Sequence, residues 1–344
     1  MSELSSPFTP ISQVGEFGLI DRLQDALGDA VPDTLAQGIG DDAAVYRVSD
    51  GRVQVITTDA LVEGVHFDRT FAPVGTLGFK AIAVNVSDVV AMNAEPRYAT
   101  VALGLPNNMS VEATETLYDG MAHACREYGL TIVGGDIAAA ERLFISVTVI
   151  GEAAESDVVY RRGARPGDVL CVTGDLGSGA AGLKVLLAEK EAFGESDAQP
   201  DLSAWSYVVQ RHLAPQARLD RIRQWREADI KPRALIDISD GLASEVHHLC
   251  RAGEVGARIE AALLPIHRQT FKAAERFGDD PATYALYGGE DYELLFAIPE
   301  GAAKRLPSDS FAVVGAVTDA VGEVVIGMPD GETRPLTASG FQHF

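Results

Sequence analysis

Aspartates recur where apolar segments end. The pattern occurs at GIGDD (38–42), ITTD (56–59), VNVSD (84–88), IVGGD (132–136) and IDISDG (236–241). A single aspartate in such a place ordinarily caps a helix or begins a turn. Several close together repel one another and raise each other's pKa unless a cation compensates. Because no His or Cys cluster accompanies them, the pattern favours Mg²⁺. We predict one converging site formed by Asp41, Asp42, Asp59, Asp88, Asp136, Asp237 and Asp240.

Glycines and arginines add a second signal. Gly134 and Gly135 precede Asp136, and glycines 288 and 289 precede Glu290. Glycine lets the backbone approach a ligand closely. Three arginines, at positions 161, 162 and 165, gather in one short segment, where a guanidinium group could hold a phosphate with two hydrogen bonds. A solvated basic patch is an equally good interpretation of that segment.

One glycine motif points elsewhere. Residues 177–182 (GSGAAG) fit G-x-G-x-x-G, follow a predicted strand and open a predicted helix. A dinucleotide site also needs a second parallel strand that ends in an acidic residue. Here a polar segment and another helix follow, so we expect a tight turn that leads into a helix. A phosphate-binding lysine is misplaced too, because Leu183 separates Gly182 from Lys184.

These residues need a framework of alternating strands and helices. Apolar periodicity and turn residues predict strands at 53–58, 98–104, 143–150, 168–173, 233–238 and 292–298. Helices are predicted at 16–27, 75–92, 111–128, 178–190, 203–212, 241–252 and 267–277. A polar, turn-rich stretch at 151–167 separates domains 1–150 and 151–344, both α/β or α+β. The segment 190–202 is predicted to be an exposed, mobile insert.

Composition narrows the class of protein. The chain has 344 residues, 47% of them hydrophobic, and a net charge of −22. Such an acidic surface repels nucleic acid and anionic membranes, and no apolar run reaches the roughly 20 residues of a membrane span. The N-terminus lacks the basic start and apolar core of a signal peptide, and three cysteines form no metal spacing. We expect a cytoplasmic protein with reduced thiols that binds anions only through cations.

Seven motifs in order resemble the thiamine-monophosphate kinase family, which belongs to the superfamily of aminoimidazole ribonucleotide synthetase. They are GIGDDAAV, TTDALVEGVHF, KAIAVNVSDVVAMNAEP, IVGGD, RRGARPGD, IDISDGL and GGEDYELLF. The likeness runs from GEFGLI (15–20) to GFQHF (340–344). It implies a homodimer with an N-terminal α/β domain that pairs with its partner and a C-terminal α/β domain that closes over it. It also implies phosphorylation of thiamine monophosphate by ATP with several Mg²⁺ ions.

The resemblance also implies roles for residues. Those that match the family's metal ligands are Asp42, Thr57, Thr58, Asp59, Asp88, Asp136, Asp237 and Asp240. Those that match nucleotide contacts are Gly135, Asp136, Arg161 and Ser239. Those that match contacts to thiamine phosphate are His66, Glu290 and Phe341. No covalent nucleophile or general base is expected.

This chain departs from the family pattern at three positions. Ile137 stands where threonine is common after GGD, Asn93 where glycine is common, and Gln342 where an acid is usual. None of these changes removes a carboxylate. Two alternatives stay open: an ATP-dependent synthetase of the same superfamily that acts on a ribonucleotide, and a non-catalytic protein that binds a nucleotide–metal complex.

Overall fold

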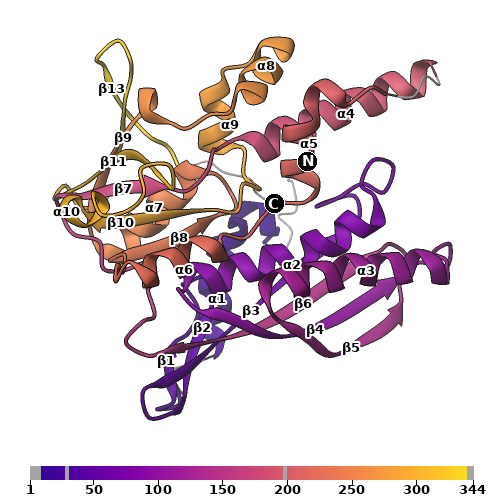
Figure 1. The fold of residues 1–344 in the computed structure, drawn as a ribbon, viewed down its shortest axis with the longest axis horizontal. Helices are drawn as coiled ribbons and strands as arrows, with labels where there is room; N and C mark the ends of the chain where they lie inside the picture. Colours follow the sequence, from indigo (N-terminus) through magenta and orange to yellow (C-terminus); the bar gives the residue numbers. More distant parts are fainter. Residues whose placement is uncertain (1–8, 28–30, 197–199, 339–344) are drawn as a thin grey trace, which may run out of the picture.

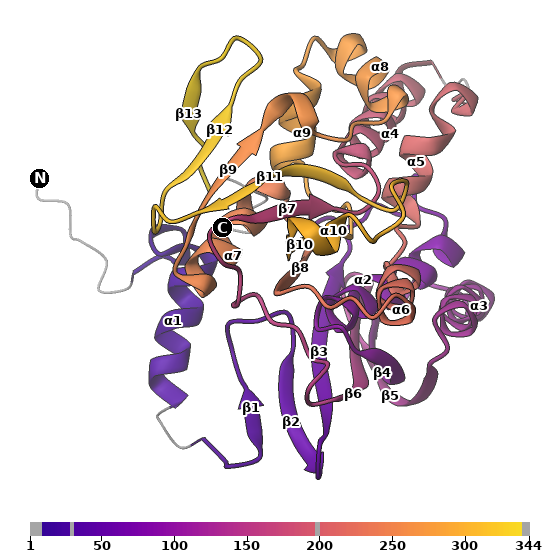
Figure 2. The same cartoon turned by 60° about the vertical axis from the view of Figure 1, so that its left-hand side comes forward.

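The computed structural model describes residues 9–27, 31–196 and 200–338. Two mixed sheets form its framework (Figures 1 and 2). The first has the strand order β1-β2-β3-β6-β4-β5. Its strands are β1 (Leu35–Gln37), β2 (Ala44–Ser49), β3 (Arg52–Val62), β4 (Glu95–Leu105), β5 (Thr131–Ala139) and β6 (Phe144–Ala154).

The second sheet has the order β13-β12-β9-β11-β7-β10-β8. Its strands are β7 (Asp168–Val172), β8 (Ala234–Ile238), β9 (Gly256–Glu260), β10 (Glu293–Pro299), β11 (Ala312–Thr318), β12 (Val324–Gly327) and β13 (Thr333–Pro335). Strands β8 and β10 are buried along nearly their whole length. They therefore carry apolar runs without alternation, as expected of strands covered on both faces.

Ten α-helices occur in the described part of the chain: α1 (Gly15–Leu27), α2 (Val74–Ala91), α3 (Val111–Tyr128), α4 (Ser178–Ser196), α5 (Ser206–Leu213), α6 (Leu219–Glu227), α7 (Leu242–Gly253), α8 (Arg268–Phe277), α9 (Pro281–Tyr287) and α10 (Glu300–Ala303). Short 3₁₀ turns lie at Ile11–Gln13, Ser203–Trp205 and Ala261–Leu263. In Figure 1, α2 and α3 lie together on one face of the six-stranded sheet.

Helix α2 lies at the centre of the molecule. It contacts β3, β4 and β6 of the first sheet and β8 of the second. Its length and hydropathy would suffice to cross a membrane, but 78% of its apolar window is buried inside the protein. An apolar helix buried on nearly all sides belongs to a core, and α2 serves as the shared core element of the two halves.

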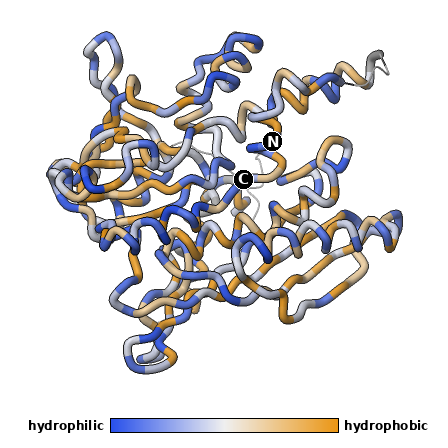
Figure 3. Tube along the Cα trace, in the orientation of Figure 1, coloured by the Kyte–Doolittle hydropathy of each residue, from blue (hydrophilic) through white to orange (hydrophobic). Residues whose placement is uncertain are grey.

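The six-stranded sheet has one covered and one open face. Along β3, Val53, Val55 and Leu61 are buried against the helices, whereas Thr58 and Ala60 between them are exposed. This alternation follows from the two-residue repeat of a strand. Figure 3 shows apolar segments along the strands of both sheets, with polar residues concentrated in outer loops and on helix surfaces.

The fold confirms the predicted mixture of strands and helices and all six predicted strands. Two details differ. The predicted helix 203–212 is a 3₁₀ turn followed by α5. The predicted insert at 190–202 is exposed at residues 190–194, as expected, but it begins as a helix, because α4 continues to Ser196. That helix keeps contact with α5 and α8, and this packing outweighs the polar composition of its last turns.

Candidate active site

Three aspartates from three elements converge between the sheets. Carboxylate oxygens of Asp42, Asp88 and Asp237 all lie within 4.8 Å of one another. Asp42 follows β1, Asp88 belongs to α2 and Asp237 to β8. Asp42 and Asp237 are 9% and 3% exposed. The predicted convergence is thus confirmed for these three side chains, which come from both halves of the chain.

Neighbouring polar groups orient the cluster. The Thr57 hydroxyl donates to Asp88 Oδ2 at 2.6 Å, and the Ser87 hydroxyl donates to Asp237 Oδ2 at 2.6 Å. The amide of Asp59 donates to Asn85 Oδ1 at 2.9 Å, which ties β3 to α2. Each carboxylate therefore has a defined direction before any ligand binds.

The cluster carries more negative charge than its surroundings accommodate. Burial raises the pKa of Asp88 well above its usual range, and the negative charges of Asp59, Asp237 and Asp42 raise it further. Burial, together with Asp42, raises the pKa of Asp237 to about 8. Burial likewise raises the pKa of Asp59 to about 6. Carboxylates in such a site need a compensating cation to be ionised together.

Asp41 and Arg161 complete the inner edge of the cluster. Arg161 Nε donates to Asp42 Oδ1 at 3.1 Å, and its backbone N–H donates to Asp41 Oδ1 at 3.3 Å. Burial and the neighbouring Asp42 raise the pKa of Asp41 to about 7. Of the three clustered arginines, Arg161 therefore contacts the acidic site. Arg162 instead stacks over the Tyr160 ring, 4.1 Å from its centroid.

One oxygen of the cluster is unsatisfied. Asp42 Oδ2 is buried and has no hydrogen-bond partner among the residues that the structure describes. Buried polar atoms are nearly always paired, so such an atom needs an explanation. Hard carboxylate oxygens that all converge on one point fit a divalent cation such as Mg²⁺. The donor set of Asp42, Asp88 and Asp237 therefore fits a magnesium ion.

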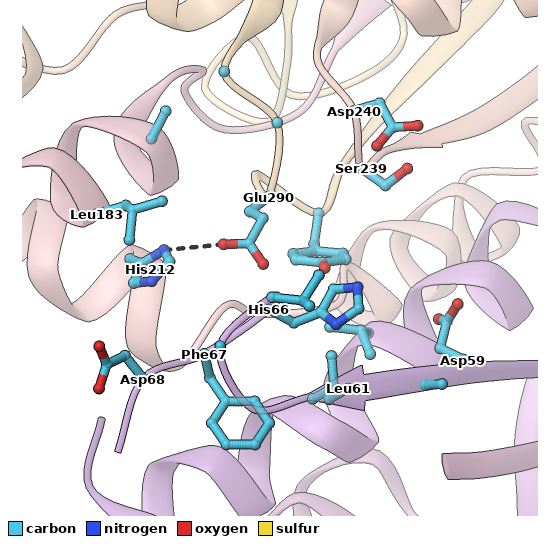
Figure 4. A pocket seen from close by; sticks show the side chains of 18 of the residues that line it. Asp59, Leu61, His66, Phe67, Asp68, Leu183, His212, Ser239, Asp240 and Glu290 are labelled. Carbon is cyan, nitrogen blue, oxygen red and sulfur yellow. Dashed lines mark ion pairs between the residues drawn. The ribbon is translucent and has the colours of Figure 1, made fainter. Parts of the chain in front are cut away.

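A cavity of about 760 Å³ opens beside the cluster. Both halves of the chain line it, and Figure 4 shows the labelled side chains converging on it. Residues predicted for the site that line it are Asp59, His66, Asp88, Asp237, Ser239, Asp240 and Glu290. The structure thus brings half of the predicted metal, nucleotide and substrate positions to one cavity.

His66 and Glu290 reach the cavity from different halves of the chain. His66 Nδ1 accepts a hydrogen bond from the Val62 amide at 3.0 Å, which fixes the ring. Glu290 projects between His66 and His212 (Figure 4). Lys80 Nζ donates to Glu290 Oε1 at 2.7 Å. The predicted pair therefore faces a common space beside the acidic cluster.

The glycines before Glu290 have a packing role. Gly289 has a φ of +68°, and a Cβ there would lie 2.6 Å from the Ser239 carbonyl oxygen. The Glu290 amide donates to that same carbonyl at 2.6 Å. The close approach that these glycines permit is thus to the Ser239–Asp240 loop, while both loops line the cavity.

The amides of the 177–182 turn are paired within the protein. The amides of Gly177 and Gly179 point at the buried Asp291 carboxylate, at 2.8 and 3.4 Å. The donors that a dinucleotide site would offer to a phosphate are thus occupied by a side chain. This agrees with the expected tight turn.

Three predicted residues lie apart from the cluster. Thr58 projects from the open face of β3, opposite to Thr57 and Asp59, as its exposure within the alternating pattern shows. Asp136 and Gly135 lie on the edge strand β5, where both are exposed. In the register, Asp136 pairs with Ala102, then Ser146, then Ala60. Three strand spacings, about 14 Å, therefore separate it from β3.

Phe341 lies outside the described residues. Four residues that the structure places at the site escaped prediction: Lys80, Ser87, His212 and Glu245, whose carboxylate accepts from the Asp240 amide at 3.0 Å. Lys80 and Ser87 had a signal in the sequence, because a charged and a hydroxyl residue interrupt an apolar helix near Asp88. His212 and Glu245 had none, since their contacts depend on packing between distant segments.

Known protein families match most of this chain, and relatives match nearly its full length. The model of AIR synthase related protein, N-terminal domain, matches residues 40–153, and that of the C-terminal domain matches 165–327. A thiamine-monophosphate kinase of Aquifex aeolicus is 37% identical over 97% of this chain and 99% of its own. One of Escherichia coli K12 is 34% identical over 96% and 98%.

Solved structures agree. AaThiL complexed with AMPPCP and TMP has a TM-score of 0.85 and 36% identity, covering 98% of this chain and all of its own. Hydrogenase maturation protein HypE, at 21% identity and a TM-score of 0.68, shares the fold alone. The identities over nearly full length and the two matched domains place this chain in the thiamine-monophosphate kinase family.

Proposed function

We propose that this protein transfers the γ-phosphoryl group of ATP to the phosphate of thiamine monophosphate, producing thiamine diphosphate and ADP. The observation that carries the proposal is the buried cluster of Asp42, Asp88 and Asp237 beside a cavity that Glu290 also lines. Relatives at 33–37% identity are thiamine-monophosphate kinases, and AMPPCP, bound in the AaThiL structure, is an ATP analogue.

Magnesium is part of the proposal. Asp42, Asp88 and Asp237 would hold it, with Asp59, Asp240 and Thr57 beside them and Thr58 and Asp136 as further ligands. Bound there, Mg²⁺ supplies neutralisation of phosphate charge. The unpaired Asp42 Oδ2 and the raised pKa values of the cluster support this assignment. A chain with a net charge of −22 needs such cations to bind polyphosphates.

The residues of the site orient the two substrates and are not needed to deprotonate the acceptor phosphate. The acceptor phosphate is already an anion at neutral pH, so transfer needs positioning more than a strong base. We assign nucleotide contacts to Gly135, Asp136, Arg161 and Ser239. Acceptor contacts are assigned to His66 and Glu290, with Phe341 as the residue predicted by resemblance. No covalent intermediate is part of this mechanism.

We further propose a cytoplasmic homodimer with domains 1–150 and 151–344. Apolar side chains on the open face of the six-stranded sheet support dimerisation: Tyr98, Val133 and Phe144 are 45%, 58% and 36% exposed. Such a group of exposed apolar residues is typical of a protein interface. A second copy seated here would also cover Thr58, whose side chain points away from the cluster, and Asp136, which lies three strands from β3.

The test mixes the purified protein with ATP, Mg²⁺ and thiamine monophosphate and resolves the thiamine compounds by chromatography. We expect thiamine diphosphate to form, to vanish with chelator and to be absent when unphosphorylated thiamine is supplied. ATP binding without diphosphate formation would contradict the acceptor assignment and favour a ribonucleotide substrate. Product formation in full chelation would contradict the role of magnesium.

A further inference from the structure

A buried lysine lies behind the Glu290 carboxylate. Lys80 belongs to the apolar helix α2, and its side chain is 4% exposed. Its Nζ lies 2.7 Å from Glu290 Oε1, a contact between residues 210 positions apart. A buried ammonium group is costly unless paired, so this lysine is held in place by a specific partner.

A buried histidine approaches the other carboxylate oxygen. His212 of α5 has a side chain 4% exposed, and its Nδ1 lies 3.0 Å from Glu290 Oε2 (Figure 4). The ring is close in distance but not aligned as a hydrogen bond. His212 therefore makes the weaker of the two contacts, and Lys80 the stronger.

The three side chains form a neutral unit. Burial alone would raise the pKa of Glu290, but the charge of Lys80 and the contact with His212 lower it to about 2. Burial lowers the pKa of His212, so its ring is uncharged at neutral pH. One cation therefore balances one anion. Glu290 consequently serves as an oriented hydrogen-bond acceptor rather than as surplus negative charge.

The backbone at Glu290 is held in an unusual conformation. Its φ is +58°, a left-handed value that costs a non-glycine residue on the order of 1 kcal/mol or more. Contacts on three sides hold it there: the Ser239 carbonyl, Lys80 and His212. Over-determined strain of this kind clusters where a side chain must be aimed.

Helix α2 links this unit to the acidic cluster. Lys80, Val84 and Asp88 follow at four-residue spacing and so lie along one face, and Val84 and Asp88 line the cavity. The eight residues from Lys80 to Asp88 span about 12 Å of helix. One rigid element thus sets the separation between the Glu290 end and the aspartate end of the cavity.

We propose that Lys80 and His212 are positioning residues that fix the Glu290 carboxylate as a hydrogen-bond acceptor for the ring-bearing end of the acceptor, with α2 setting its distance from the phosphate-transfer end. The inference rests on the proposed function, since it takes Glu290 to contact thiamine monophosphate. Neither residue is among those that the family resemblance assigns to the site.

The test compares steady-state kinetics of Lys80→Met and His212→Leu with those of the wild type. We expect Lys80→Met to raise the KM for thiamine monophosphate about 10-fold or more, since a hydrogen bond to a charged group is lost. The KM for ATP should change less than about 3-fold. His212→Leu should act in the same direction with a smaller change. Lys304→Met, in the exposed pair with Glu300, is the matched control.

Conservative variants and a double-mutant comparison distinguish loss of positioning from loss of folding. Lys80→Arg and His212→Asn keep a donor near the carboxylate and should restore much of the KM. In the Glu290→Gln background, Lys80→Met should add little, because residues that act through one another are non-additive. If Lys80→Met does not fold, the KM values for thiamine monophosphate and ATP are measured instead for His212→Leu. They are also measured for the double variant Lys80→Gln, Glu290→Gln, which is compared with Glu290→Gln alone.

The outcomes are distinct. Equal increases in both KM values, or full additivity with Glu290→Gln, would overturn the positioning role. A wild type that forms no thiamine diphosphate would instead reject the proposed function itself. An active wild type whose Lys80 and His212 variants keep a normal KM for thiamine monophosphate would reject only this inference.

Discussion

Each carboxylate of the cluster is oriented by a different neighbour. Thr57 binds Asp88, Ser87 binds Asp237 and Arg161 binds Asp42. Among the described residues, Asp42 Oδ2 alone in this cluster is buried without a hydrogen-bond partner, and a bound cation would satisfy it. Individually these side chains resemble caps and turn residues, and only their shared location gives them a common chemistry.

The first prediction concerns the oriented carboxylates themselves. Asp88→Asn and Asp59→Asn should each lower kcat on the order of 10²-fold, comparable to removal of one preorganised electrostatic group. The substitution keeps the shape and removes the charge that holds the cation. The measurement is kcat as a function of Mg²⁺ concentration. Full activity of both variants at low Mg²⁺ would contradict the metal assignment, and Asp309→Asn on an exposed turn serves as control.

The second prediction concerns pH. Without metal, burial holds the folded pKa values of Asp59, Asp41 and Asp237 at about 6, 7 and 8, above their usual values. The folded state then keeps protons that the unfolded state has lost. Stability should therefore decrease as pH rises from about 4 to 8. Mg²⁺ should flatten this decrease, because it compensates the ionised form.

Thermal unfolding between pH 5 and 8, in chelator and in excess Mg²⁺, checks this prediction. The gain in Tm on adding Mg²⁺ should grow with pH. A gain independent of pH would mean that the metal binds away from these carboxylates. The Asp237→Asn variant should show a shallower pH dependence in chelator, because one raised group is gone.

Single residues show what the sequence could and could not reveal. Asn93 stands where the family resemblance leads us to expect glycine, and its φ of +53° fits that expectation, since glycine adopts this conformation freely and asparagine tolerates it better than most other residues. The aspartates of the site could be predicted because they stand where apolar segments end. His212 gave no such signal, because its partner Glu290 meets it only after both halves pack.

At the scale of elements, α2 and α3 pack with unusual closeness. A Cβ at Gly78 would lie 2.0 Å from the Leu117 carbonyl oxygen, and one at Gly120 would lie 1.8 Å from that of Gly75. The two helices therefore touch along their backbones. Because α2 carries both Lys80 and Asp88, this contact positions both ends of the cavity.

The third prediction follows from that contact. Gly78→Ala should lower the free energy of unfolding by about 1–3 kcal/mol, as overpacking forces the helices apart. It should also lower kcat, because α2 shifts. Gly194→Ala is the matched control: it lies in α4 with nothing within 4 Å of the added Cβ, so it should be neutral or stabilising. Denaturant titration and activity measure both effects.

Elements with strong periodicity could be predicted from the sequence, and weaker ones could not. The strands that match β3, β4, β6, β7, β8 and β10 are all apolar and bounded by turn residues. The sequence did not predict helices α6, α9 and α10 or strands β1, β2, β5, β9, β11, β12 and β13. Exposure explains β5, whose residues lie almost entirely at the surface. The division at residues 150 and 151 stays a prediction; the sheets themselves end at Ala154 and begin at Asp168.

At the scale of the whole molecule, one chain leaves its open sheet face uncovered. Thr58 and Asp136 both lie on the six-stranded sheet away from the acidic cluster. The family resemblance nevertheless assigns both to metal ions. Within a single chain these two side chains do not reach the acidic cluster. They could contribute to a metal site only if the open face of a second copy packed against them. This is the physical reason why we propose a homodimer.

The fourth prediction tests the interface. The wild type should sediment with twice the 36.5 kDa mass of the chain. Val133→Asp should shift it toward the monomer, because a charge would be buried among apolar side chains. Val321→Asp, at a site 69% exposed in the turn between β11 and β12, should leave the dimer intact. A monomeric wild type at assay concentrations would contradict the proposal.

The fifth prediction asks whether the partner completes the site. If Asp136 serves the cluster of the other chain, Asp59→Asn and Asp136→Asn damage different halves of one composite site. Each variant alone should be nearly inactive. In a mixture that exchanges subunits, about half of the dimers are hybrids, and each hybrid has one intact site and one doubly altered site. Activity should then recover toward about one quarter of the wild-type value, following the symmetry of a two-fold dimer. If both aspartates served the same chain's site, every site in the mixture would keep one defect and no activity would return. Mixing Asp59→Asn with Asp88→Asn provides the control, because both lie on the same side of the interface and cannot complement each other.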